Sequence, residues 1–405
     1  MKCGLLGRKL GHSYSPAIHS HFGNYEYSLY EREPEELETF LRNGDFDGLN
    51  VTMPYKKTVI PYLDELTPVA QCVGAVNTIY RRNGKLVGHN TDFYGFQQML
   101  HRSGISTAEK KCLVLGSGGA SQVAVQVLKD AGGDVVVISR SGKDNYENIS
   151  RHSDAAIIVN ATTVGMYPDT GVSPVDLELF PRLECVLDVV YNPARTQLLM
   201  EAARRGIVAM SGLWMLVSQA WESSDLMTGI PVPEANAEEV YRILQRNMEN
   251  IILIGMPGCG KSTIGRLIAE ETGKRFVDSD VEIEKLAQKS IPRIFAEDGE
   301  TAFRNLEHRV LAELGKQSGL VIATGGGCVT QERNYPLLHQ NGTICWLQRD
   351  LRKLPTDGRP LSVNLEEMYR LRQDRYAAFA DQIVDNNGDL GATVDQILAY
   401  WEETI

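Results

Sequence analysis

A glycine-rich stretch in the second half of the chain most constrains its fold. Residues 255–263 read GMPGCGKST and fit the pattern G-x-x-x-x-G-K-[ST] at every fixed position. The apolar run 251–254 before it predicts a buried strand, and apolar residues at helical spacing after it predict a helix. A loop of this kind between a strand and a helix binds phosphate, because its backbone N–H groups converge on the phosphate oxygens. We therefore predict that a nucleotide-binding domain begins near residue 250.

The residue types in this loop suit separate parts of a nucleotide. We expect Lys261 to reach the outer phosphates and Ser262 to hold Mg²⁺. The alternative is an ordinary glycine-rich turn with an incidental lysine, but the flanking strand and helix favour the nucleotide site. The remaining nucleotide contacts that we predict are Gly258, Cys259, Gly260 and Thr263.

Length and composition limit what the other residues can form. A chain of 405 residues has room for two or three domains of ordinary size. The net charge of −11 argues against nucleic acid as a partner, because no excess of cations is available to displace the counterions of phosphates. Seven cysteines without a C-x-x-C pair indicate reduced thiols and a cytoplasmic location. We find no signal peptide, and no apolar stretch long enough to cross a membrane.

Short apolar strands, one of them predicted at 76–80, alternate with amphipathic stretches in the first hundred residues, which suggests an α/β unit. Polar residues gather where these elements end. Taken singly, each fits a turn residue, an N-cap or a solvated lysine. Together they fit a site for a small polyhydroxylated molecule, in which Lys56 and Asp92 would be an acid/base pair. The polar residues concerned are Ser13, Ser15, Asn50, Thr52, Lys56, Asn77, Asn90 and Asp92.

A second nucleotide site is predicted near residue 116. The strand 111–115 is followed by GSGGAS, a helix and a second strand, 135–138. This order is typical of a dinucleotide-binding fold. Arg140 follows the second strand, where a cation favours the 2′-phosphate of NADP, although an exposed loop arginine is the alternative. The glycine-loop contacts that we predict are Gly116, Gly118, Gly119 and Ala120.

The chain then continues as a doubly wound sheet and returns through helices. Strands at 156–159 and 186–189 both run into polar turns, as expected at the cofactor edge of such a sheet. The apolar helix that begins near Gly212 carries Gln219, which is either a satisfied buried amide or a substrate contact. A charged amphipathic helix, 236–249, leads almost directly into the strand at Ile251.

Residues 1–245 resemble shikimate dehydrogenases in eight blocks that occur in the family's order. The blocks are GHSYSP, NVTMPYK, GAVNT, NTD, GSGGAS, NATTVGM, YNPARTQLL and GLWMLVSQA. The resemblance implies that Lys56 and Asp92 are catalytic, and that Ser13, Ser15, Asn50, Thr52, Asn77, Asp92 and Gln219 hold the substrate. It also places Tyr191 and Gly212 where the cofactor meets the substrate. The chain departs from the family at His89 and Phe93, which flank NTD where Asp and Gly are usual.

Residues 250–405 are similar to shikimate kinases. The motifs are the phosphate loop, Asp278-Ser279-Asp280, ATGGG at 323–327, DGRPL and Arg372-x-x-x-Tyr376. The resemblance implies that Asp278 helps to place Mg²⁺ and that Asp280 binds the ring hydroxyls and orients or deprotonates the attacking one. Two carboxylates, a lysine and converging arginines are the groups that phosphoryl transfer requires. Arg304, Gly326 and Arg372 are implied as further contacts to shikimate.

Arg352 and Arg359 match the arginines of the family's lid and are implied as contacts to ATP. The chain between Leu347 and Arg352 is several residues shorter than is usual in the family.

The sequence thus predicts an α/β protein with two consecutive activities. We expect NADPH-dependent reduction of 3-dehydroshikimate, followed by phosphorylation of shikimate by ATP with Mg²⁺. The alternatives are a quinate-preferring front half, a rear half reduced to a weakened or regulatory module, and a nucleotide sensor without activity. Monomer and dimer both stay open. The predicted domains are a substrate domain (1–104, completed by helices at 206–248), a Rossmann NADP domain (105–205) and a P-loop domain with a parallel sheet like that of nucleoside-monophosphate kinases (250–405).

Overall fold

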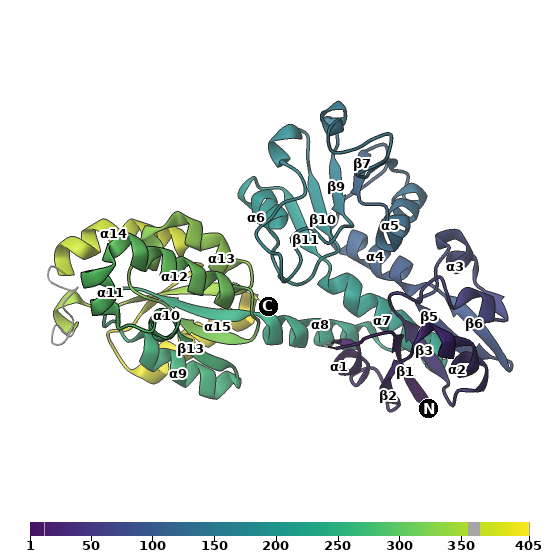
Figure 1. The fold of residues 1–405 in the computed structure, drawn as a ribbon, viewed down its shortest axis with the longest axis horizontal. Helices are drawn as coiled ribbons and strands as arrows, with labels where there is room; N and C mark the ends of the chain where they lie inside the picture. The colour runs from purple at the N-terminus through teal and green to yellow at the C-terminus, as the bar shows by residue number, and fades with distance from the viewer. Residues whose placement is uncertain (12, 355–364, 405) are drawn as a thin grey trace. The chain divides into compact units, whose positions relative to one another are not determined.

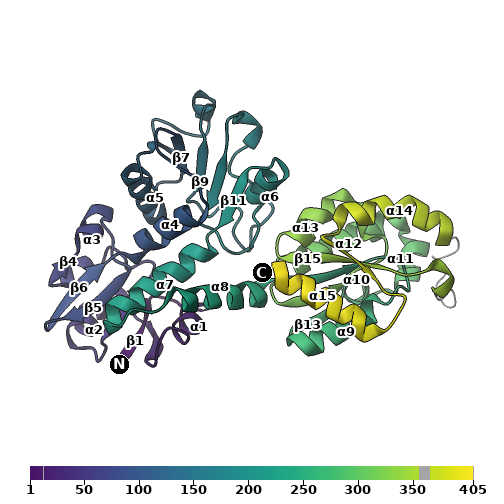
Figure 2. The same cartoon turned by 180° about the vertical axis from the view of Figure 1, so that it is seen from behind.

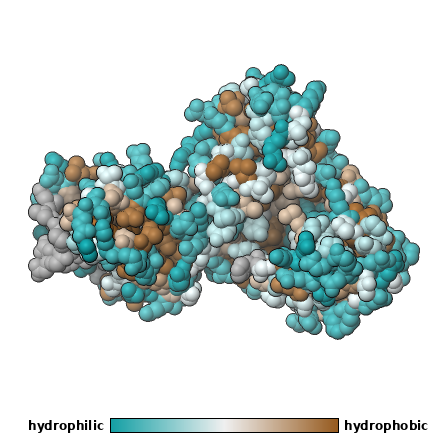
Figure 3. All heavy atoms as spheres, in the orientation of Figure 1, coloured by the Kyte–Doolittle hydropathy of each residue, from teal (hydrophilic) through white to brown (hydrophobic). Residues whose placement is uncertain are grey.

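The computed structural model describes residues 1–11, 13–354 and 365–404, and its chain divides into two compact units. The first comprises residues 1–166, 172–191 and 198–243, and the second comprises residues 167–171, 192–197 and 244–405. Each unit has its own hydrophobic core. Hydrophilic residues cover most of the face seen in Figure 3. No helix among the described residues is long and apolar enough to span a membrane.

The first unit opens with a mixed sheet in the order β2-β1-β3-β5-β6-β4. β5 is antiparallel to both of its neighbours, whereas the other pairs are parallel. The predicted strand starting at Val76 begins at Thr78 instead. The elements are β1 (Lys2–Gly7), α1 (Ser15–His19), β2 (Glu26–Glu31), η1 (Pro34–Glu36), α2 (Leu37–Asn43), β3 (Gly48–Val51), η2 (Ile60–Tyr62), β4 (Glu65–Leu66), α3 (Pro68–Val73), β5 (Thr78–Arg82), β6 (Lys85–His89) and α4 (Thr91–Arg102).

The second sheet of this unit is wholly parallel, in the order β11-β10-β9-β7-β8. This doubly wound sheet confirms the predicted dinucleotide-binding fold. The elements are β7 (Lys111–Leu115), α5 (Gly119–Asp130), β8 (Asp134–Ile138), η3 (Ile149–His152), β9 (Ile157–Asn160), η4 (Leu177–Leu179), β10 (Cys185–Asp188), α6 (Gln197–Arg204), β11 (Val208–Ser211), α7 (Leu213–Thr228) and α8 (Glu234–Met248), the last of which contains the boundary between the units.

Helices α4 and α7 lie between the two sheets of the first unit (Figures 1 and 2). Phe96 and Met99 of α4 join Cys112 and Val114 of β7 in one buried cluster. The two helices approach closely at Gly95, because a Cβ built there would lie 2.7 Å from the carbonyl oxygen of Met215. The predicted apolar helix, α7, is therefore held directly against α4, which carries Asp92 in its first turn.

The second unit contains a five-stranded parallel sheet in the order β13-β14-β12-β15-β16. Helices α12 and α13 cover the face toward the viewer in Figure 1, and α9 and α15 cover the face toward the viewer in Figure 2. The elements are β12 (Asn250–Ile254), α9 (Lys261–Thr272), β13 (Arg275–Asp278), α10 (Ser279–Ala287), α11 (Ile291–Glu297), α12 (Gly299–Gly315), β14 (Leu320–Ala323), η5 (Cys328–Thr330), η6 (Glu332–Asn334), α13 (Tyr335–His339), β15 (Gly342–Gln348), η7 (Leu351–Lys353), α14 (Leu365–Phe379), β16 (Gln382–Asp385) and α15 (Leu390–Thr404).

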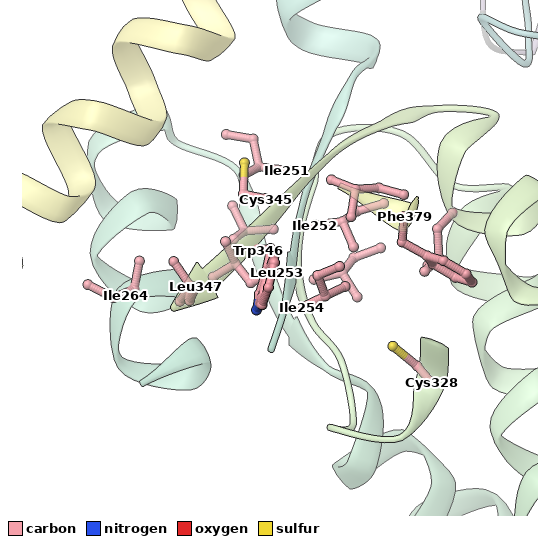
Figure 4. Packing of buried hydrophobic residues seen from close by; sticks show 14 of the residues in the cluster. Ile251, Ile252, Leu253, Ile254, Ile264, Cys328, Cys345, Trp346, Leu347 and Phe379 are labelled. Carbon is pink, nitrogen blue, oxygen red and sulfur yellow. The ribbon is translucent and has the colours of Figure 1, made fainter. Parts of the chain in front are cut away.

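β12 is the central strand of this sheet and is buried on both faces. Ile251 and Leu253 lie on one side of the strand, and Ile252 and Ile254 lie on the other (Figure 4). All four side chains are fully buried. Covering helices on both faces explain why β12 is a continuous apolar run rather than an alternating one.

Candidate active sites

Lys56 and Asp92 form an ion pair in the first unit. Lys56 Nζ lies 2.6 Å from Asp92 Oδ2, with 31% of the lysine side chain and 19% of the aspartate side chain exposed. Lys56 follows β3, and Asp92 lies in the first turn of α4, where a carboxylate also interacts favourably with the helix dipole. The structure thus brings together the two groups that the sequence predicts as an acid/base pair, and leaves them accessible to a ligand.

Two predicted amide side chains are largely occupied by protein groups. Asn77 Oδ1 accepts hydrogen bonds from the backbone N–H of Thr91 (2.7 Å) and from the hydroxyl of Thr78 (3.2 Å). Asn50 Nδ2 donates to Ser223 Oγ at 2.8 Å, and Asn50 Oδ1 accepts from the hydroxyl of Tyr27 at 2.7 Å. Both amides therefore link neighbouring elements around the ion pair.

The other predicted substrate contacts lie in the same unit, the serines and Thr52 at the ends of elements and Gln219 within α7. Ser13 Oγ accepts a hydrogen bond from the backbone N–H of Ser15 at the start of α1. Thr52 follows β3, and its backbone N–H donates to Leu6 at the end of β1. On α7, Gln219 Nε2 donates to the carbonyl of Leu216, and its Cβ lies 3.1 Å from a Cβ built on Gly95 of α4.

His89 connects the end of β6 to α7. Its Nδ1 lies 2.7 Å from Thr67 Oγ1, and its Nε2 lies 3.6 Å from Glu222 Oε1. Sequence reasoning identified His89 only as a departure from the family and did not assign it a contact. Glu222 follows Gln219 by one helical turn, and that spacing was the available signal.

The glycine loop after β7 has the open geometry that a dinucleotide requires. Gly116 has a φ of +106° and is the residue that turns the chain. A Cβ built on Gly118 or on Gly119 would meet no atom within 4 Å, so the space above the start of α5, where Ala120 lies, is free for a ligand. Arg140 is exposed beyond the end of β8.

Gly212 and Tyr191 lie near the carboxyl end of β10. A Cβ built on Gly212 would be 2.2 Å from the carbonyl oxygen of Val189, so only glycine permits this approach. The ring of Tyr191 meets the ring of Tyr14 edge to face, with centroids 6.1 Å apart. Tyr191 thus joins the parallel sheet to the loop that precedes α1.

The phosphate loop of the second unit adopts the predicted conformation between β12 and α9. Gly255, Gly258 and Gly260 have φ angles of +141°, +82° and +104°, which favour glycine. Lys261 is buried, and its Nζ donates to the carbonyls of Gly255 (2.9 Å) and Met256 (3.0 Å). Cys259 is buried beneath the loop, whereas Thr263 is exposed at the first turn of α9.

The residues predicted to hold Mg²⁺ lie together. Ser262 Oγ donates to Asp278 Oδ2 at 2.7 Å, and Asp278 Oδ1 accepts from the backbone N–H of Asp280. Mg²⁺ at nucleotide sites is held by one or two carboxylates together with phosphates and water, so this donor set fits the ion. Burial, assisted by the charge of Asp278, raises the pKa of Asp280, whose Oδ1 is buried without a hydrogen-bond partner among the described residues.

Arg304 lies against the glycine turn after β14. It donates to Glu307 Oε2 at 2.9 Å and to Glu300 Oε1 at 3.2 Å. A Cβ built on Gly327 would lie 2.4 Å from Arg304 Nη1, so the turn leaves room for the guanidinium only because it lacks side chains. Burial raises the pKa of Glu307, and its Oε1 has no hydrogen-bond partner among the described residues. Sequence reasoning missed Glu307, although its spacing of three from Arg304 on a helix was visible.

Gly326 is the meeting point of the other predicted contacts. Its carbonyl accepts hydrogen bonds from Arg372 Nη1 (3.1 Å) and from the hydroxyl of Tyr376. Arg352, which is predicted as a contact to ATP, has 90% of its side chain exposed, and its guanidinium pairs with Asp350. Arg359 falls outside the described residues.

A paired lysine and aspartate beside a dinucleotide fold, joined to a phosphate loop with a Ser–Asp magnesium site, define a class of protein. The class is a nicotinamide-nucleotide-dependent oxidoreductase fused to a P-loop phosphotransferase. Comparison with known proteins names the families. Residues 5–79 match the model of the shikimate dehydrogenase substrate binding domain, and residues 257–402 match that of shikimate kinase. The chain belongs to the shikimate dehydrogenase family and carries a shikimate kinase domain.

Individual relatives agree with this classification over the front of the chain. The NADP-dependent shikimate dehydrogenase of Clostridium perfringens strain 13 is 33% identical over 264 residues, which cover 60% of this chain and 97% of the relative. The enzyme of Thermococcus kodakarensis is 37% identical, with 57% and 92% covered.

Solved structures show the same fold. A chorismate mutase/shikimate 5-dehydrogenase fusion protein from Clostridium acetobutylicum matches with a TM-score of 0.57 and 36% identity, covering 60% of this chain and 97% of that one. Shikimate 5-dehydrogenase from Thermus thermophilus, in complex with NADP(H) and shikimate, matches with a TM-score of 0.54 and 33% identity, covering 60% and 99%.

Proposed function

We propose that this chain catalyses two consecutive reactions. The first unit reduces 3-dehydroshikimate to shikimate with NADPH, and the second phosphorylates shikimate with ATP and Mg²⁺ to shikimate 3-phosphate. The families of the two units support this pairing. Seven free cysteines, six of them buried, support a cytoplasmic location.

The observation that carries the first reaction is the ion pair between Lys56 and Asp92. Bound NADPH supplies the hydride that the ketone carbon receives. Lys56 Nζ donates a proton to the ketone oxygen, and Asp92 Oδ2, 2.6 Å away, holds the ammonium in position. Gln219 and the serines at the start of α1 bind the substrate hydroxyls and carboxylate, and Arg140 binds the 2′-phosphate of the cofactor.

The second reaction is supported by the convergence of charged groups at the phosphate loop. Lys261 would neutralise charge on the phosphates, and Ser262 and Asp278, which lie in hydrogen-bond contact, would hold Mg²⁺, which supplies further positive charge there. Asp280 Oδ1, which lacks a protein partner among the described residues, accepts the proton of the attacking hydroxyl. Arg304 and Arg372 bind the carboxylate of shikimate, since a guanidinium can donate two parallel hydrogen bonds to a carboxylate.

One reaction mixture tests both assignments. The full chain is incubated with 3-dehydroshikimate, NADPH and MgATP, and the products are identified by mass spectrometry. We expect shikimate 3-phosphate. Accumulation of unphosphorylated shikimate would contradict the kinase assignment, and unreacted 3-dehydroshikimate would contradict the dehydrogenase assignment.

A further inference from the structure

Arg349 is the first residue beyond β15 and lies beside the phosphate loop. β15 runs parallel to β12, with Trp346 opposite Ile254, so the chain leaves both strands at the same edge of the sheet. A Cβ built on Gly260 would lie 3.8 Å from Arg349 Nη1. The guanidinium is therefore next to the last glycine of the loop, where backbone N–H groups converge on phosphate.

The guanidinium of Arg349 has unused hydrogen-bonding capacity. Its Nε is buried and has no hydrogen-bond partner in the part of the chain that the structure describes. None of the ion pairs found among those residues includes Arg349. A buried donor without an acceptor costs free energy and is rare in folded proteins, so this N–H points to an acceptor that arrives with a ligand.

The backbone around Arg349 is fixed by hydrogen bonds to the phosphate loop. Asn386 N donates to Gln348, the residue before Arg349, at 2.8 Å, and Asn386 Nδ2 donates to the carbonyl of Cys259 at 2.6 Å. Thr393 Oγ1 holds the Asn386 side chain from the other side. This network positions Arg349 relative to the loop before a ligand binds.

Arg352, which the family resemblance implies as an ATP contact, differs from Arg349 because its side chain is exposed and paired with a carboxylate. Its guanidinium lies 2.6 Å from Asp350 Oδ2, and the same carboxylate caps η7 by accepting from the backbone N–H of Arg352. This pairing lowers the pKa of Asp350 to about 2. Arg352 is therefore neutralised by its neighbour and directed to solvent.

We propose that Arg349 binds the phosphate chain of the nucleotide and performs the task that the resemblance assigns to Arg352. A guanidinium presents parallel N–H donors that match phosphate oxygens, and its position against Gly260 favours the phosphates over the adenine ring. This inference rests on the proposed function of the second unit as an ATP-dependent kinase.

The test compares Arg349→Gln with Arg352→Gln in the full chain. Affinities for MgADP and for adenosine are measured by calorimetric titration, with adenosine taken to millimolar concentration. Losing hydrogen bonds to a charged group weakens binding by roughly 10- to 100-fold. We expect Arg349→Gln to weaken MgADP binding by that factor and to leave adenosine binding unchanged, whereas Arg352→Gln changes MgADP binding by less than about twofold.

Control measurements separate this inference from a folding defect and from the kinase proposal. Arg349→Lys keeps the charge and should retain part of the affinity, and NADP⁺ binding by the first unit should match the wild type in all variants. Unchanged MgADP binding in Arg349→Gln would overturn the inference, as would an equal loss for adenosine, which would assign Arg349 to the base. A wild-type chain that binds MgADP but does not phosphorylate shikimate would overturn the kinase proposal alone, because the comparison of MgADP affinities still tests Arg349.

Discussion

Lys56 shows how a single residue can separate the two activities. The Lys56–Asp92 pair lies wholly in the first unit, and its loss leaves the residues of the phosphate loop in place. Because general acid catalysis contributes about 10²- to 10⁴-fold to a rate, we expect Lys56→Ala to lower kcat for NADPH oxidation by that factor. The kinase rate with added shikimate should stay within about twofold of the wild type.

The measurement for Lys56→Ala is the decrease in NADPH absorbance, alongside a coupled assay of ADP release. Lys57→Ala is the matched control, because Lys57 is the exposed neighbour and is absent from the ion pairs of the described residues. An equal fall of both activities in Lys56→Ala would show that the units do not work independently.

The buried carboxylate of Asp280 lowers the free energy of unfolding when it is ionised. Its proposed role as the proton acceptor accounts for a carboxylate at this position. Burial raises its pKa above the ordinary value of 3.8, so the folded chain holds this proton more tightly than the unfolded chain does. The stability that the protonated form contributes is present below pH 3.8 and is lost as pH rises through the raised pKa. Ionisation of this carboxylate as the pH rises therefore destabilises the unliganded fold.

We expect Asp280→Asn to raise the Tm of the second unit at pH 7 while abolishing shikimate phosphorylation. The gain in Tm should shrink as the pH falls toward the ordinary pKa. The wild-type carboxyl then becomes protonated and is neutral, like the amide of the variant. Thermal melts across a pH series measure this, with Asp374→Asn on the exposed side of α14 as the control. A Tm gain that does not depend on pH would contradict the assigned cause.

At the scale of elements, the packing of α4 on α7 positions two of the predicted substrate residues. Asp92 lies on α4 three residues before Gly95, and Gln219 lies on α7 opposite Gly95. The absence of a side chain at residue 95 allows this approach, since a Cβ there would lie 2.7 Å from a backbone oxygen that cannot move freely. The distance between the two helices thus sets the distance between two predicted ligand groups.

Gly95→Ala should force the two helices apart. Overpacking of this kind typically costs about 1–3 kcal/mol, so we expect a lower Tm for the first unit and a raised KM for 3-dehydroshikimate. Gln97→Ala, on the exposed face of α4, is the control and should change neither quantity. Tm is measured by calorimetry and KM by NADPH oxidation, and an unchanged KM would show that helix separation does not position Gln219.

At the scale of the whole molecule, the chain has two units with separate hydrophobic cores. A ligand stabilises only the unit that binds it, by about 2.7 kcal/mol at a concentration 100 times its Kd. Scanning calorimetry should therefore show two transitions, one raised by NADP⁺ and the other by MgADP. A single transition raised equally by either ligand would contradict this expectation.

Much of the fold could be predicted because its strongest signals are local. Alternating apolar strands and amphipathic helices gave β7, α5 and β8 in order, and the apolar run 251–254 gave β12. The structure agrees with these predictions because a strand or a helix must place its apolar residues at a regular spacing in order to bury them. The start of β5 was less predictable. Residues 76 and 77, which were predicted as strand, belong to the loop before β5.

The sequence by itself determined the two phosphate-binding loops, because glycine spacing between a strand and a helix is a local property of the chain. It also predicted Lys56 and Asp92 as an acid/base pair, from their residue types at the ends of elements. Only the tertiary structure decided which partners meet. It brought Glu307 to Arg304, turned Arg352 toward Asp350, and left Arg349 with a buried, unpartnered N–H beside Gly260. Contacts of this kind depend on where β15, α12 and the glycine turns lie in space, which no local pattern encodes.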